Sequence, residues 1–148
     1  MATIVLAPEY GYTAAAALLS IALVTFLGGR VDSYRKFAQV PLPFPYADAA
    51  ECKEDHKKYI FNCYQRVHQN TLEGFSAYLV MLMFAGLKYP IASAALGGVW
   101  FLGRVLYYIG YTTGDPSKRH YGTFGHIGEL GLLGLSAKFA FDLITSQA

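Results

Sequence analysis

The stretch that most constrains this chain is residues 10–29, YGYTAAAALLSIALVTFLGG, which contain no charged residue. In a helix these residues would extend about 30 Å, the thickness of the hydrocarbon core of a bilayer. A helix of a soluble bundle needs one polar side for water, and this stretch offers none. We therefore predict that residues 10–29 cross a membrane, and a soluble four-helix bundle is the least favoured alternative.

Other apolar stretches predict three further spans, at residues 60–87, 91–114 and 123–144. The whole chain is 54% hydrophobic and 15% charged, whereas soluble domains are about 25% charged. The expected fold is therefore a single all-α domain over residues 1–148, a four-transmembrane-helix bundle. Glu129 and Lys138 interrupt the last span and are interpreted as contacts between protomers, with a proton relay as the alternative.

The positive charges are concentrated in two of the predicted connections. Residues 30–59 and 115–122 hold eight of the twelve Lys and Arg residues. Cytosolic loops of membrane proteins carry an excess of such residues, so both loops are predicted to be cytosolic and both termini to lie on the other side. A net charge of +2 without a basic patch argues against nucleic acid as a partner.

Cysteine and histidine do not suggest a crosslink or a metal. Cys52 and Cys63 are expected to be reduced thiols, because two isolated cysteines do not make a disulfide framework. The four histidines lack the spacing of metal ligands, so no metal is expected.

A polar stripe begins the second predicted span, in the sequence FNCYQRVHQNTLE at residues 61–73. Arg66, Asn70 and Glu73 are spaced i, i+4 and i+7, which places them within about 60° of arc on one helical face. Ionisable groups in a spanning helix usually face a bundle interior or a wet cavity, because exposure to lipid is costly. The stripe is therefore a candidate binding site, with a purely structural Arg66–Glu73 ion pair as the alternative.

The third predicted span supplies a possible partner surface at the same depth. Arg104, Tyr107 and Tyr111 are spaced i, i+3 and i+7, and the turn that follows carries Lys118 and Arg119. Arg104 by itself is interpreted as a helix-packing charge rather than a catalytic group. Without further context the two tyrosines would be interfacial belt aromatics.

The residue set is compatible with glutathione, although composition alone does not select this ligand. Glutathione has two carboxylates for arginines, an ammonium group for Glu73 and peptide bonds for Asn70. Arginine suits carboxylates because its planar guanidinium binds both oxygens.

The motifs FNCYQRVHQNTLE and GRVLYYIGYTTGDPSKR resemble those of the membrane-associated eicosanoid and glutathione proteins, most closely the type 3 microsomal glutathione S-transferases. The likeness runs from EYGY at residues 9–12 to the fourth span. The resemblance implies a homotrimer of four-helix protomers, with glutathione held between neighbouring subunits near the cytosolic face. It also implies the endoplasmic reticulum as the membrane, with the mitochondrial outer membrane as the alternative.

The resemblance also implies roles for individual residues. Arg119 would stabilise the glutathione thiolate, with Lys118 as the alternative. Arg35 would be a basic contact supplied by the neighbouring subunit. The residues that would bind glutathione within this set are Arg66, His68, Asn70, Glu73, Tyr107 and Tyr111. His68 and Gly74 stand where leukotriene C synthase has glutamine and tyrosine, which leaves the second substrate open.

The implied activity is attack of the glutathione thiolate on lipophilic electrophiles and lipid hydroperoxides that arrive from the membrane lipid. A free thiol has a pKa of about 8.5, and a nearby guanidinium would favour the anion. The chain is thus expected to be a glutathione transferase with glutathione peroxidase activity, and leukotriene-C-synthase-like conjugation falls within the same chemistry. Two other classes remain open: a non-catalytic lipid- or glutathione-binding protein, and an assembly subunit of a larger membrane complex.

Overall fold

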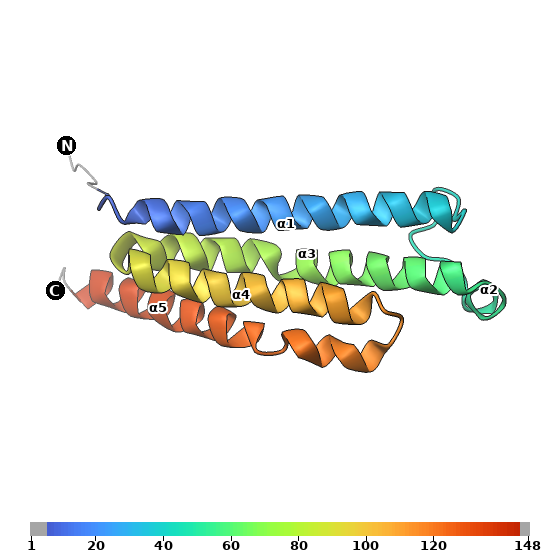
Figure 1. The fold of residues 1–148 in the computed structure, drawn as a ribbon. Helices are drawn as coiled ribbons and strands as arrows, with labels where there is room; N and C mark the ends of the chain where they lie inside the picture. Colours follow the sequence, from blue (N-terminus) through green and yellow to red (C-terminus); the bar gives the residue numbers. More distant parts are fainter. Residues whose placement is uncertain (1–5, 146–148) are drawn as a thin grey trace.

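A computed structural model describes residues 6–145, in which every regular element is helical (Figure 1). Four long helices form the body of the molecule, and two short elements lie in the connections. The elements in chain order are α1 (Tyr10–Phe37), α2 (Ala49–Glu54), α3 (His56–Lys88), α4 (Pro90–Tyr111), the 3₁₀ helix η1 (Pro116–Gly122) and α5 (Gly125–Thr145). The predicted all-helical class is confirmed.

The long helices lie side by side with α3 and α4 in the middle. Both α1 and α5 pack against this central pair, from opposite sides (Figure 1). The tight α3–α4 turn lies at the same end of the bundle as the start of α1 and the end of α5, whereas α2 and η1 lie at the opposite end. The two predicted basic connections therefore meet at one end of the molecule.

Three of these helices, α1, α3 and α4, are long and apolar enough to cross a membrane. Their outer surfaces expose large apolar side chains, such as Leu18 and Leu19 on α1, at 66% and 59%. On α5, Ile127 and Phe141 are both 65% exposed, but Glu129, Lys138 and Asp142 interrupt its apolar sequence. Such wide apolar surfaces are unusual in soluble monomers and are expected where lipid covers the protein.

The prediction of one continuous loop over residues 30–59 is wrong. Helix α1 continues to Phe37, about three turns of helix follow in α2 and the first residues of α3, and only residues 38–48 and Asp55 are irregular. The charged residues after position 29 do not stop a helix, since Arg and Lys are good helix formers. The helix ends where Gln39 adopts a positive φ of 53° before the proline-rich segment PLPFP.

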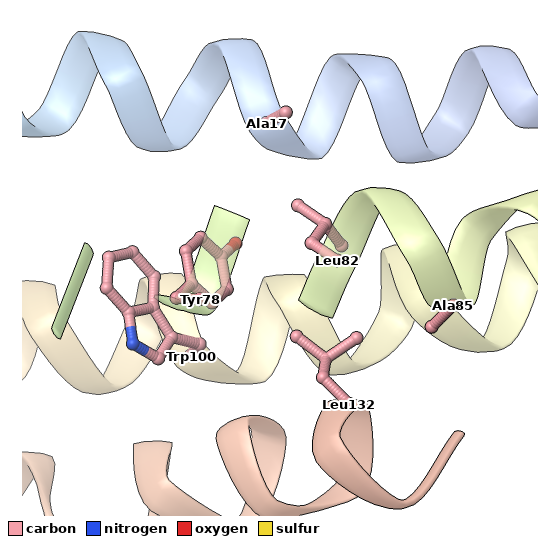
Figure 2. Packing of buried hydrophobic residues seen from close by; sticks show 6 residues of the cluster. All are labelled: Ala17, Tyr78, Leu82, Ala85, Trp100 and Leu132. Carbon is pink, nitrogen blue, oxygen red and sulfur yellow. The ribbon is translucent and has the colours of Figure 1, made fainter. Parts of the chain in front are cut away.

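The central core joins all four long helices through a small set of buried side chains (Figure 2). Trp100 of α4 stacks on Tyr78 of α3 with ring centroids 3.8 Å apart. The Tyr78 hydroxyl pairs with the Ser20 hydroxyl of α1 at 2.9 Å. A buried tyrosine needs such a partner, because neither the core nor the lipid offers water.

Glycines allow α4 to approach η1 and α5 at backbone distance. A Cβ atom placed on Gly103 would lie 2.5 Å from the Cα of Gly125, and one on Gly110 would collide with the carbonyl oxygen of Lys118. On α5, a Cβ on Gly128 would lie 2.8 Å from the backbone nitrogen of Trp100. Small residues are the usual means by which membrane helices pack this closely.

We expect Gly103→Ala to destabilise the bundle by about 1–3 kcal/mol, because the added methyl group forces α4 and α5 apart. Gly98→Ala is the matched control on the same helix, since no atom lies within 4 Å of its added Cβ. The control should be neutral or slightly stabilising, because alanine favours helix. Thermal unfolding of both variants in detergent measures the difference, and equal midpoints would contradict the tight contact.

Candidate functional site

A cleft of about 360 Å³ opens between α3, α4, η1 and α5. Its volume falls within the range of about 300–1,000 Å³ that is usual for small-molecule sites. Polar and aromatic side chains from four elements surround it. The lining residues are Arg66, Asn70, Gly103, Arg104, Tyr107, Tyr111, Arg119, His120, Gly122, Thr123, Gly125 and His126.

Helix α3 contributes the polar stripe as three adjoining side chains. Arg66 Nη1 donates to Glu73 Oε1 at 2.9 Å, and Asn70 Nδ2 donates to Glu73 Oε2 at 3.4 Å. The Arg66 and Glu73 side chains remain 41% and 49% exposed. An ion pair this exposed contributes little to stability, so both groups are available to a ligand at low cost.

Helix α4 adds the guanidinium of Arg104, which the sequence placed on a possible partner surface and interpreted by itself as a helix-packing charge. Arg104 Nη1 donates to Asn70 Oδ1 at 2.9 Å and so connects α4 to the stripe. Its guanidinium carbon also lies 5.5 Å from the Trp100 ring centroid and 5.9 Å from that of Tyr107. Arg104 therefore packs and lines the cleft at once. The sequence signal for a place in the cleft was the i, i+3, i+7 spacing of Arg104 with Tyr107 and Tyr111.

The 3₁₀ helix η1 brings Arg119 to the cleft. Its first turn is fixed by Asp115, which accepts from the backbone nitrogen of Ser117 at 3.0 Å and from its hydroxyl at 2.7 Å. These hydrogen bonds hold the pKa of Asp115 below its usual value, so the carboxylate is charged at neutral pH. The cap thus sets the direction of the segment that carries Arg119.

The neighbouring Lys118 is placed differently. Its backbone carbonyl packs against Gly110, and its Nζ lies 3.9 Å from Asp115 Oδ2. Arg119 lines the cleft and Lys118 is not among the lining residues. Of the two basic residues that the sequence offered, only Arg119 faces the cleft.

Helix α5 contributes His126 and Glu129, which were not predicted as site residues. His126 Nδ1 lies 3.1 Å from Glu129 Oε2, and the imidazole lines the cleft. The i, i+3 spacing of a histidine and a glutamate at the start of a span was the only signal in the sequence. This spacing did not predict a site, because the direction in which the two side chains point depends on how α5 packs against α4.

Arg35 and His68 lie outside this cleft. Arg35 Nη1 donates to the carbonyl oxygen of Phe44 at 2.7 Å, and its guanidinium carbon is 4.7 Å from the Phe61 ring centroid. His68 faces α1, where its Nε2 lies 3.5 Å from the position of a Cβ on Gly28. Of the eight predicted site residues, five line the cleft, Glu73 adjoins it, and these two lie on the side of α3 that meets α1.

Within residues 6–145, no group of three or more His, Cys, Asp or Glu side chains could hold a metal ion. Cys52 and Cys63 are free cysteines. Burial raises the pKa of the Cys52 thiol, so this cysteine is held as a thiol rather than as a reactive thiolate.

Residues 13–139 match the MAPEG family, so this chain belongs to the MAPEG family. The match covers most of the chain and includes every residue of the cleft. The family consists largely of glutathione-dependent enzymes and includes glutathione transferases, glutathione peroxidases and leukotriene C synthase. The protein is therefore an integral membrane protein with three candidate spans, from a family that typically uses glutathione.

We expect Asp115→Ala to loosen η1, because the backbone nitrogen of Ser117 loses its capping acceptor. Loss of such a cap costs about 0.5–2 kcal/mol. Backbone amides of residues 117–122 should then exchange hydrogen several-fold faster, measured by mass spectrometry in detergent. Asp115→Asn keeps an acceptor oxygen and should exchange close to the wild-type rate. Equal exchange in the Ala variant and the wild type would contradict this role of Asp115.

Proposed function

We propose that this protein is a membrane-bound glutathione transferase with glutathione-dependent peroxidase activity, most similar in kind to the type 3 microsomal enzymes. The observation that carries this proposal is the position of Arg119, which lines the same cleft as the stripe on α3 and the tyrosines on α4. A thiol-activating cation and a set of peptide-binding groups thus share one site. The second substrate would be a lipophilic electrophile or a lipid hydroperoxide from the bilayer.

The charges of the cleft complement those of glutathione. Arg66 and Arg104 supply two guanidinium groups for its two carboxylates. Glu73 supplies a carboxylate for its ammonium group, and the Asn70 amide can pair with a peptide bond. The Arg66–Glu73 contact would open on binding, and its exposure makes that exchange inexpensive.

Arg119 would supply the chemistry by stabilising the thiolate. A free thiol has a pKa of about 8.5, so only a few per cent is ionised at neutral pH. An adjacent guanidinium favours the charged form, and each unit of pKa corresponds to about 1.4 kcal/mol. The thiolate is the attacking species in both conjugation and peroxide reduction.

The proposed homotrimer would place the cleft between protomers, with Arg35 of a neighbouring protomer as a basic contact. Arg35 lies on α1 outside the cleft of its own protomer, where its Nη1 donates to the carbonyl oxygen of Phe44. His68 faces Gly28 of α1 in its own protomer, so only the family resemblance supports a glutathione contact for this residue. The same proposal makes α5 a fourth span, with residues 30–59 and 115–122 in the cytosol and the endoplasmic reticulum as the membrane. The mitochondrial outer membrane is the alternative.

Thiolate formation tests the proposed role of Arg119. We expect glutathione to give a saturable thiolate absorbance in the ultraviolet with purified wild-type protein, and Arg119→Ala to abolish it at neutral pH. A neighbouring charge shifts a pKa by about 1–3 units, which is enough to remove most of the anion. Lys118→Ala is the matched control and should keep the signal.

The possible results separate the alternatives. Loss of the signal in Lys118→Ala but not in Arg119→Ala would transfer the role to Lys118. Absence of both binding and thiolate in the wild type would contradict the enzyme proposal. A non-catalytic lipid-binding protein, or a subunit of a larger membrane complex, would then be favoured.

The proposed pairing of Glu73 with the ammonium group of glutathione has its own test. Hydrogen bonds to charged groups contribute about 1.5–3 kcal/mol, so Glu73→Gln should weaken glutathione binding by about tenfold or more. A glutathione analogue without the amino group should bind both proteins equally, or the variant more tightly because Arg66 is released. Calorimetric titration measures both ligands, and an equal loss of affinity for both would contradict the pairing.

A further inference from the structure

Helix α5 carries a polar pair in the cleft that glutathione binding does not require. His126 Nδ1 and Glu129 Oε2 lie 3.1 Å apart, one helical turn from each other. The imidazole lines the cleft and its side chain is 62% exposed, whereas that of Glu129 is 27% exposed. The histidine is thus accessible from the cleft, and the glutamate is set back behind it.

The carboxylate of Glu129 lies opposite a glycine of the neighbouring helix α3. A Cβ on Gly74 of α3 would lie 3.8 Å from Glu129 Oε1, in ordinary van der Waals contact. Arg104 of α4 interacts electrostatically with the same carboxylate. Glu129 thus lies near α3 and α4 and contacts His126 on its own helix.

This contact orients the imidazole. A carboxylate at Nδ1 favours the proton on that nitrogen and leaves Nε2 without a partner from Glu129. Within residues 6–145 the ring makes no other hydrogen bond. A histidine held by a carboxylate, with its second nitrogen directed to a reactant, is the usual arrangement of a general acid or base.

We propose that His126 is the proton donor for peroxide reduction and that Glu129 is its positioning residue. This inference rests on the proposed glutathione activity. The thiolate sulfur bonds to the terminal oxygen of a lipid hydroperoxide, and the O–O bond breaks. The proton donor in this step is the imidazolium form of His126, whose Nδ1 proton is bonded to Glu129. The departing alkoxide takes the Nε2 proton and leaves as an alcohol, and His126 becomes neutral.

The electrons and atoms balance with glutathione as the only reductant. Sulfur is oxidised to a sulfenic acid while the peroxide is reduced. A second glutathione thiol then displaces water from the sulfenic acid and forms the disulfide. The imidazole recovers its proton from solvent through the open cleft.

The role separates the two activities of one site. An alkoxide is a poor leaving group that needs a proton, whereas the chloride of an aryl halide leaves as a stable anion. Both reactions begin with the same thiolate at the same guanidinium. Loss of the proton donor therefore lowers the peroxidase rate relative to the conjugation rate. A change in glutathione binding or in thiolate formation affects both rates equally and leaves their ratio unchanged.

The test compares His126→Gln with wild-type protein in detergent or nanodiscs. Cumene hydroperoxide is the peroxide and chlorodinitrobenzene the electrophile. General acid catalysis contributes about 10²–10⁴-fold, so the peroxidase-to-conjugation ratio of the variant should fall roughly 100-fold. His56→Gln is the matched control, because His56 begins α3 outside the cleft lining, and it should keep the wild-type ratio.

A second variant tests the positioning role and does not remove the imidazole. Glu129→Ala removes the carboxylate that orients the imidazole. The peroxidase-to-conjugation ratio of this variant should therefore fall about tenfold, while KM for the peroxide changes little. Glu129→Gln keeps an acceptor oxygen and should recover part of this loss. A change in KM alone would point to a structural role for Glu129 and overturn this part of the inference.

The outcomes distinguish this inference from the proposed function. If the thiolate and aryl-halide conjugation are present but His126→Gln keeps the wild-type ratio, His126 is not the proton donor. If wild-type protein forms no thiolate and conjugates nothing, the proposed function fails and this inference fails with it. A selective loss of peroxidase activity in His126→Gln supports the role of His126.

Discussion

The close contact of α4 with η1 and α5 is the constraint on which the site depends. In a bilayer the hydrophobic effect does not press helices together, because lipid tails are as apolar as the side chains they replace. The backbones approach at Gly103, Gly110 and Gly128, where a Cβ would collide with the facing chain. This contact determines where Arg119 and His126 lie relative to Arg104. The arrangement of the groups in the cleft therefore depends on glycines outside the reacting groups, which let the backbones approach.

The sequence predicted well what periodicity and charge determine. The uncharged stretch at residues 10–29 and the regular spacing of Arg66, Asn70 and Glu73 each depend on one helix only, and the structure brings these three side chains together. The extent of α1 was underestimated, since charged residues mark the edge of a span but do not end a helix. Its end at Gln39 depends on a backbone conformation and on the prolines that follow.

The missed residues depend on contacts between helices. Arg104 was interpreted as a packing charge because its bond to Asn70 requires the α3–α4 register. His126 and Glu129 are one turn apart on α5, but only the packing of α5 turns the imidazole toward the cleft. Gly74 was noted in the sequence as a departure from leukotriene C synthase, but its place opposite Glu129 of α5 depends on how the helices pack.

The two carboxylates of α5, Asp142 and Glu129, differ in whether their partners are accessible from the cleft. Near the end of α5, Asp142 is bonded by Lys88 of α3 at 2.5 Å and by Lys138 at 3.2 Å, so its charge is matched within the bundle. Near the start of α5, Glu129 is also paired, but its partner His126 lines the cleft. Pairing lowers the cost of both carboxylates in an apolar helix. Pairing therefore explains Asp142 without a ligand, whereas the imidazole beside Glu129 is paired and still accessible, which is what the proposed proton donor requires.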